Sequence, residues 1–225
     1  MEREDRAAAA VTSLAKEPVD ARISLAGLVG AIGGLAYLVV RFHDDPPLLA
    51  TMMIYGLSLI VLFGASTLYH GVRAGIGATR VFRTVDHASI YVLIAGSYTP
   101  VLFAGLSGWW RTGTIAAIWA VAAAGIVLTV WFVNAPRWLS AAIYVAMGWL
   151  VLVPGIQLIR NVPLVALALF LTGGLLYTTG AVIYATRQMN FLPRRFGFHE
   201  VFHLFVVAAA ATQYAGIAFF MLNTR

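Results

Sequence analysis

The sequence predicts an all-α integral membrane protein, a bundle of seven transmembrane helices with a cytosolic N-terminus and a C-terminus outside. Hydrophobic residues make up 61% of the 225 residues and charged residues only 11%, whereas a soluble domain averages about a quarter charged residues. The apolar residues form runs of about 20, the length of helix that crosses roughly 30 Å of bilayer hydrocarbon. Cysteine is absent, which excludes disulfides and thiolate metal ligands.

Seven apolar runs follow a polar tail in which acidic residues interrupt any signal-peptide pattern. The runs cover residues 23–42, 48–69, 86–106, 112–133, 138–159, 162–185 and 199–222. Most breaks carry proline, asparagine, aspartate or glycine, which favour turns, and the weakest break is 160–161. Pro100 and Pro154 lie within runs and are expected to kink their helices. We therefore expect a cytosolic polar tail over 1–22 and one seven-helix membrane domain over 23–225.

Lysine and arginine determine the expected orientation. Eleven of the 15 basic residues fall in the tail and in the loops that share its side of the bundle. Short cytosolic loops are enriched in basic residues, so the tail side is expected to face the cytosol. The net charge of +6 is therefore explained by membrane topology and does not indicate nucleic-acid binding.

Five polar residues stand near the ends of three of these runs. Polar groups beside hydrocarbon are costly and persist mostly where they have partners or a function. In the predicted topology all five lie near the cytosolic side, although the chain separates some of them by more than a hundred residues. They are Ser66, His70, Asp86, His199 and His203.

The three histidines suggest a metal site. His199 and His203 are spaced i, i+4, so their side chains share one helix face. With His70 from another helix they provide three imidazoles and an open position, the pattern of a catalytic zinc site. Zinc lowers the pKa of a water molecule it holds to about 7 and polarises a carbonyl. Ser66 could hydrogen-bond that water, and Asp86 could hold it, accept its proton or ligate the metal.

Other interpretations of these residues stay open. An HxxxH pair alone is weak evidence, because such pairs often serve packing or interhelical hydrogen bonds, and imidazole also suits copper, iron and nickel. A serine in a helix commonly bonds the carbonyl four residues earlier. Glu200 is a candidate proton carrier, and His87 a weaker candidate for contact with the site. The only lysine is Lys16, in the tail, so no span can form a retinal Schiff base.

The motifs that carry these residues resemble the PAQR/hemolysin III family, which includes the adiponectin and progestin receptors. The matching elements are Ser-Thr-Leu-Tyr-His at 66–70, Asp-His at 86–87, Ala-Gly-Ser-Tyr-Thr-Pro at 95–100 and His-Glu-Val-Phe-His at 199–203. They extend from the second run to the seventh. The short tail resembles the bacterial hemolysin III branch, which implies a multi-pass protein of the bacterial inner (cytoplasmic) membrane.

The resemblance implies a zinc ion held by His70, His199 and His203, with Asp86 and Ser66 close to the zinc-bound water. The family is also similar to alkaline ceramidases, which implies hydrolysis of an amide or ester in a membrane lipid, with Asp86 as general base and Ser66 positioning water. The alternative is a non-catalytic sensor, receptor or regulator of lipid homeostasis in which zinc is structural. The family name implies cytolysis, but nothing in the sequence indicates a pore.

Overall fold

The computed structural model describes residues 16–132, 135–192 and 196–223, and these are almost entirely helical. The predicted tail lies outside the described residues from 1 to 15. In the described ranges the only β-structure is an isolated bridge between Leu192 and Phe196, so the all-α prediction is confirmed. The elements are α2 (Pro18–Phe42), α3 (Pro46–Gly71), α4 (Ile76–Gly105), α5 (Gly108–Trp131), α6 (Arg137–Gly148), the 3₁₀ turn η1 (Trp149–Leu152), α7 (Gly155–Asn161), α8 (Leu164–Thr186) and α9 (Phe198–Leu222).

Six of the described helices are long and apolar enough to cross a membrane, and a bent pair makes the number up to seven. The pair consists of 137–152 and Gly155–Asn161, which meet at an angle of 57°. Pro154 lies at this break, as its position in the fifth run predicted. Helix α4, in contrast, continues through Pro100 without a break.

Two helices begin earlier than their apolar runs. Helix α2 begins at Pro18 rather than at residue 23, because proline suits the first helical turn, where its missing N–H is not needed. Helix α4 begins at Ile76 rather than at residue 86, so a polar segment precedes its apolar part. Asp86 therefore lies well inside a helix instead of at its start, and residues 18–22 belong to a helix rather than to a tail.

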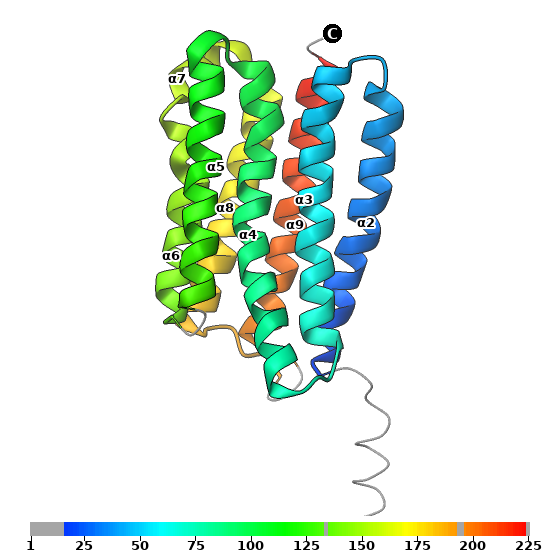
Figure 1. Cartoon of the computed structure of the whole chain (residues 1–225), viewed down its shortest axis with the longest axis vertical. Coiled ribbons are helices and arrows are strands. Elements are labelled where there is room, and N and C mark those ends of the chain that lie inside the picture. Colours follow the sequence, from blue (N-terminus) through cyan, green and yellow to red (C-terminus); the bar gives the residue numbers. More distant parts are fainter. Residues whose placement is uncertain (1–15, 133–134, 193–195, 224–225) are drawn as a thin grey trace, which may run out of the picture.

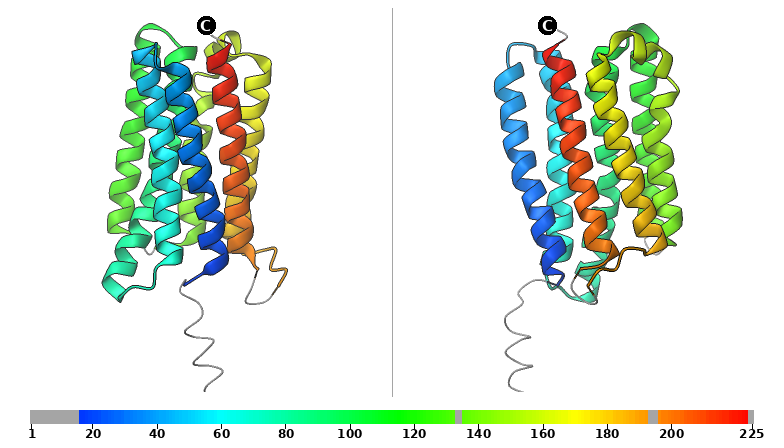
Figure 2. Two further views of the ribbon diagram at one scale, coloured as in Figure 1. Left: turned by 90° about the vertical axis from the view of Figure 1, so that its right-hand side faces the viewer. Right: turned by 180° about the vertical axis from the view of Figure 1, so that it is seen from behind.

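The helices run alternately up and down (Figure 1). Helix α3 packs between α2 and α4, and α8 packs between α6 and α9. Helix α2 also packs against α9, so the first and last helices of the described chain are neighbours (Figure 2). The starts of α2 and α9 and the end of α3 consequently meet at one end of the bundle, opposite the C-terminus (Figure 1).

A close approach of α5 to α4 depends on Gly125. A Cβ atom at this position would lie 2.2 Å from Cε1 of Tyr91. The Tyr91 ring is buried and packs edge-on against Tyr144, with ring centroids 4.9 Å apart. We expect Gly125→Ala to lower the free energy of unfolding by about 1–3 kcal/mol through overpacking.

Gly113→Ala is the matched control for this prediction, because Gly113 lies on the same helix with its nearest neighbour, Cε3 of Trp109, at 3.5 Å. Alanine is the better helix former by about 1 kcal/mol, so the control should be no less stable than the wild type. Thermal unfolding of both variants in mild detergent measures the difference. Equal thermal unfolding midpoints for Gly125→Ala and the wild type would contradict the prediction, and they would show that α5 moves away from Tyr91 without a loss of stability.

Candidate metal centre

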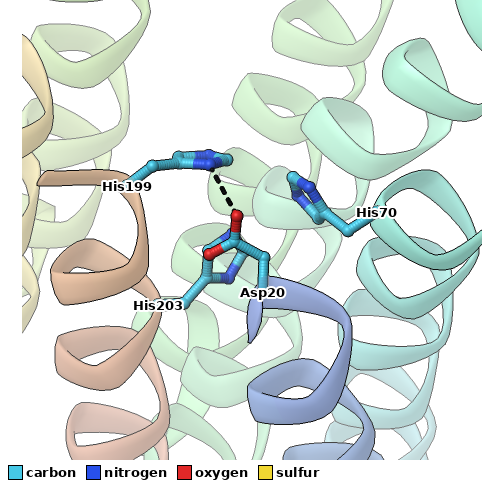
Figure 3. Close-up of side chains that lie close together, drawn as sticks. All are labelled: Asp20, His70, His199 and His203. Atoms are coloured by element: carbon cyan, nitrogen blue, oxygen red, sulfur yellow. Dashed lines mark hydrogen bonds and ion pairs between the residues drawn. The ribbon is translucent and has the colours of Figure 1, made fainter. Parts of the chain in front are cut away.

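The three histidines predicted as metal ligands come together at the end of the bundle where α2 begins. His70 is in the last turn of α3, His199 is in the first turn of α9, and His203 lies one turn deeper. The ring centroids are 5.0 Å apart for His70 and His199 and 4.8 Å apart for the two pairs that include His203. One ion can therefore be reached by all three rings (Figure 3).

A fourth residue, Asp20, joins this cluster from the first turn of α2 (Figure 3). One ligand atom from each of Asp20, His70, His199 and His203 lies within 4.8 Å of the others. Asp20 is 1% exposed, and its Oδ2 is 3.2 Å from Nδ1 of His199. We call these four residues the His–Asp cluster. The cluster agrees with the predicted histidine set and adds a carboxylate that the sequence-based prediction placed in the tail.

The signal for Asp20 was present in the sequence at Pro18. Proline is favoured at the first position of a helix, and a helix starting there carries residue 20 to the same membrane depth as the histidines. Hydropathy alone gives a boundary at residue 22. It misses the first turn of a helix when that turn is polar, and so it leaves Asp20 in the tail.

The cluster fits a metal ion because two of its buried polar atoms have no protein partner. Nε2 of His203 and Oδ1 of Asp20 are buried without a hydrogen bond among the described residues. An unsatisfied buried polar atom costs about 1–3 kcal/mol, and a cation held at the cluster would give these atoms a partner, either directly or through a water molecule that it binds. Nitrogen and carboxylate donors without thiolates suit zinc and several other divalent ions.

Glu17, the N-cap residue of α2, forms two hydrogen bonds with His70. Its carboxylate accepts a hydrogen bond from Nδ1 of His70, and its backbone N–H donates to the His70 carbonyl at 2.9 Å. The hydrogen bond from His70 is the main cause that lowers the pKa of the Glu17 carboxyl group. The end of α3 is thus tied to the start of α2 by both side chain and backbone.

The two residues predicted to act on water lie beside the cluster. Ser66 is buried, and its Oγ is 2.9 Å from Oγ of Ser24, so it bonds a neighbouring helix rather than its own. Asp86 hydrogen-bonds the Ser66 side chain and lies close to His70 and His199. Asp86 is absent from the group within ligand distance, so it stands next to the cluster and not in it.

The two remaining candidates, Glu200 and His87, have different positions. The Glu200 carboxylate accepts a hydrogen bond from the Gly197 N–H at 2.8 Å and so caps α9. That contact gives Glu200 a structural role, and its candidacy as a proton carrier stays a prediction. His87 lines the same cavity as Asp86.

A cavity of about 450 Å³ opens from the cluster into the bundle. Its polar end is lined by Glu17, Ser66, Asp86, His199 and His203. Its other end reaches Gln213, ten residues after His203 on α9, which corresponds to roughly 15 Å at 1.5 Å per residue. Between them the walls are largely aliphatic and aromatic, with Leu62, Phe63, Leu93, Ile94, Phe202 and Val206. The cavity therefore runs from the polar side chains at the cluster, between aliphatic and aromatic walls, to further polar side chains that include Ser97, Thr178 and Gln213.

Comparison with known proteins identifies the family of the chain. A family model described as Haemolysin-III related matches residues 12–214. The chain is 31% identical over 200 residues to Hemolysin-3 of Bacillus cereus, which covers 88% of each protein. It is 30% identical over 199 residues to the Hemolysin-3 homolog of Bacillus subtilis (strain 168), covering 88% of this chain and 90% of that one. The Monocyte to macrophage differentiation factor of Homo sapiens is 31% identical over 194 residues, covering 84% and 78%.

Proposed function

The chain belongs to the haemolysin III-related family of multi-pass membrane proteins, and we propose that it is a zinc-dependent hydrolase of a membrane lipid amide or ester. The observation that carries this proposal is the cavity that is lined at one end by His199 and His203 of the His–Asp cluster. A lipid would place its amide or ester bonds at this end and its acyl chains against the aliphatic and aromatic walls beyond it. A volume near 450 Å³ lies in the range of about 300–1,000 Å³ that is usual for ligand pockets.

The residues around the cluster have separate roles in the proposed reaction. When bound by the three histidines, zinc would supply a water of lowered pKa and polarise the scissile carbonyl. Asp86, beside His70 and His199, would accept the proton of the attacking water and return it to the leaving group. Ser66, held at Ser24, would orient that water by a hydrogen bond.

The proposed orientation in the membrane follows from the basic residues of the sequence. The start of α2, the loop after α3 and the segment before α9 all lie at one end of the bundle (Figure 1), and the basic residues concentrate at this end. By the positive-inside tendency this end faces the cytosol, in the bacterial inner membrane. The lipid bond to be cleaved would then lie at the cytosolic interface.

A second function is favoured by the fourth member of the cluster. If Asp20 ligates the ion together with the histidines, the site has four protein ligands, which is the arrangement of structural zinc. The protein would then be a membrane sensor or receptor whose zinc stabilises the fold. The two functions differ in whether one coordination position stays open.

Lipid turnover by the purified protein tests the proposal. We expect zinc-loaded protein in mild detergent to release fatty acid from ceramides or phospholipids, measured by mass spectrometry. Metal-stripped protein should be inactive and should recover on addition of one equivalent of zinc. If zinc raises the unfolding temperature but neither lipid class is hydrolysed, the sensor function is correct instead.

A further inference from the structure

The geometry points to Glu17 and Asp20 as positioning residues that hold the imidazoles of His70 and His199 so that both rings bind the metal through Nε2. This inference rests on the proposed metal centre and concerns how the start of α2 shapes it. Both carboxylates come from the first turn of one helix, and each contacts a histidine on a different helix. Helix α2 would thus set the orientation of two ligands contributed by α3 and α9.

Asp20 determines the orientation of the His199 ring. Its Oδ2 lies 3.2 Å from Nδ1 of His199, and an ionised carboxylate only accepts hydrogen bonds. Nδ1 must therefore carry the proton, which leaves the lone pair on Nε2 for a metal. Metal-bound histidines almost always donate their other ring N–H to a carboxylate, carbonyl or water in this way.

Glu17 acts on His70 in the same manner. Its Oε2 accepts from Nδ1 of His70, and the backbone bond from the Glu17 N–H to the His70 carbonyl fixes the two residues at a constant separation. Because Glu17 is the N-cap and Pro18 starts the helix, the main chain has little freedom at this point. The His70 ring is 1% exposed and cannot swing into water.

His203 completes the arrangement without a carboxylate. Its Nε2 is the buried nitrogen that has no partner among the described residues, and its ring packs edge-on against those of His70 and His199. All three histidines then offer Nε2 to one point. Asp20 stays outside the coordination sphere, and its unpartnered Oδ1 is available to a small molecule in the fourth position.

Zinc affinity of paired variants tests this assignment. Competition with a chromophoric chelator gives the dissociation constant for wild type, Asp20→Ala, Asp20→Asn, Glu17→Ala and Glu17→Gln. We expect each alanine variant to bind zinc about 10–100-fold more weakly, the usual loss for such a partner. The amide variants should recover most of this loss, since an amide oxygen still accepts the Nδ1–H.

Asp44→Ala is the matched control. Asp44 pairs with His43 at 3.0 Å, is exposed, and lies at the opposite end of the bundle. Its removal should leave the zinc dissociation constant unchanged. Equal affinities for all variants and the wild type would overturn the inference.

Nitrogen NMR of ¹⁵N-histidine-labelled, zinc-loaded wild type provides a readout that does not depend on any variant folding. We expect metal-shifted Nε2 and protonated Nδ1 signals for His70 and His199. A metal-bound Nδ1 in either residue, or an Asp20→Asn variant as weak as Asp20→Ala, would show that the carboxylate is not a positioning group.

The outcomes separate this inference from the proposed hydrolase. Amide rescue in a protein that hydrolyses no lipid leaves the positioning role intact and removes the enzymatic function. Lipid turnover by a protein whose amide variants do not recover zinc affinity supports the enzymatic function and removes the positioning role. A wild type that binds no zinc overturns both.

Discussion

Replacing His203 by alanine is expected to remove zinc binding from the protein. The wild type should hold about one zinc per chain after purification in mild detergent. The variant should bind more than about 100-fold more weakly, because the loss of a direct ligand exceeds the 10–100-fold loss typical of an outer partner. Inductively coupled plasma mass spectrometry and chelator competition measure both values.

The stability of the metal-free His203→Ala variant shows whether zinc is lost because a ligand is missing or because the protein unfolds. Because Nε2 of His203 is buried without a partner, its removal eliminates an unsatisfied group, which offsets part of the packing loss. The metal-free variant should therefore fold, while the rise in unfolding temperature on adding zinc should disappear. His43→Ala, at an exposed histidine in the loop before α3, should keep both zinc and the thermal shift. Full zinc occupancy in His203→Ala would contradict the assignment.

Replacing Asp86 by asparagine is expected to abolish lipid turnover while zinc remains bound. Asparagine keeps the shape of the side chain but cannot accept a proton, and positioned general bases contribute about 10²–10⁴-fold to rate. Asp86 is outside the group of residues within ligand distance, so the zinc content should stay near one per chain. Fatty-acid release and metal content are measured on the same preparation.

Two results would change the role of Asp86. Loss of zinc in Asp86→Asn would make it a ligand, and undiminished turnover would remove it from the reaction. Ser66→Ala serves as the neighbouring comparison, because Ser66 contacts Asp86 but has its own partner in Ser24. Its effect on turnover should be smaller than that of Asp86→Asn.

Much of the fold could be predicted because the bilayer imposes a fixed length on each apolar run. The seven runs correspond to six long helices and one bent pair. The bend at Pro154 was predicted from a single residue, whereas Pro100 leaves α4 unbroken. Hydropathy could not give the starts of α2 and α4, because charged residues, Asp20 and Arg22 in α2 and Arg80 and Arg83 in α4, lie between each start and the apolar part of the helix.

The histidines of the cluster could be predicted because their spacing and membrane depth follow from local geometry. An i, i+4 pair shares a helix face in any helix, and helix order alone brings His70 to the same end. For Asp20, Pro18 indicates the membrane depth, but its contact with His199 depends on how α2 packs against α9, which no local pattern encodes. The hydrogen bond between Ser24 and Ser66 likewise depends on how two helices pack, and no local pattern predicts it.

The neighbouring positions of α2 and α9 have a consequence for the biogenesis of the protein. The His–Asp cluster takes its members from the first, second and last helices of the described chain, so a ribosome-bound intermediate that ends before α9 has only Asp20 and His70. Such an intermediate lacks two of the three imidazoles and cannot retain the ion. Binding of the proposed ion would then require that α9 has entered the bilayer and packed against α2.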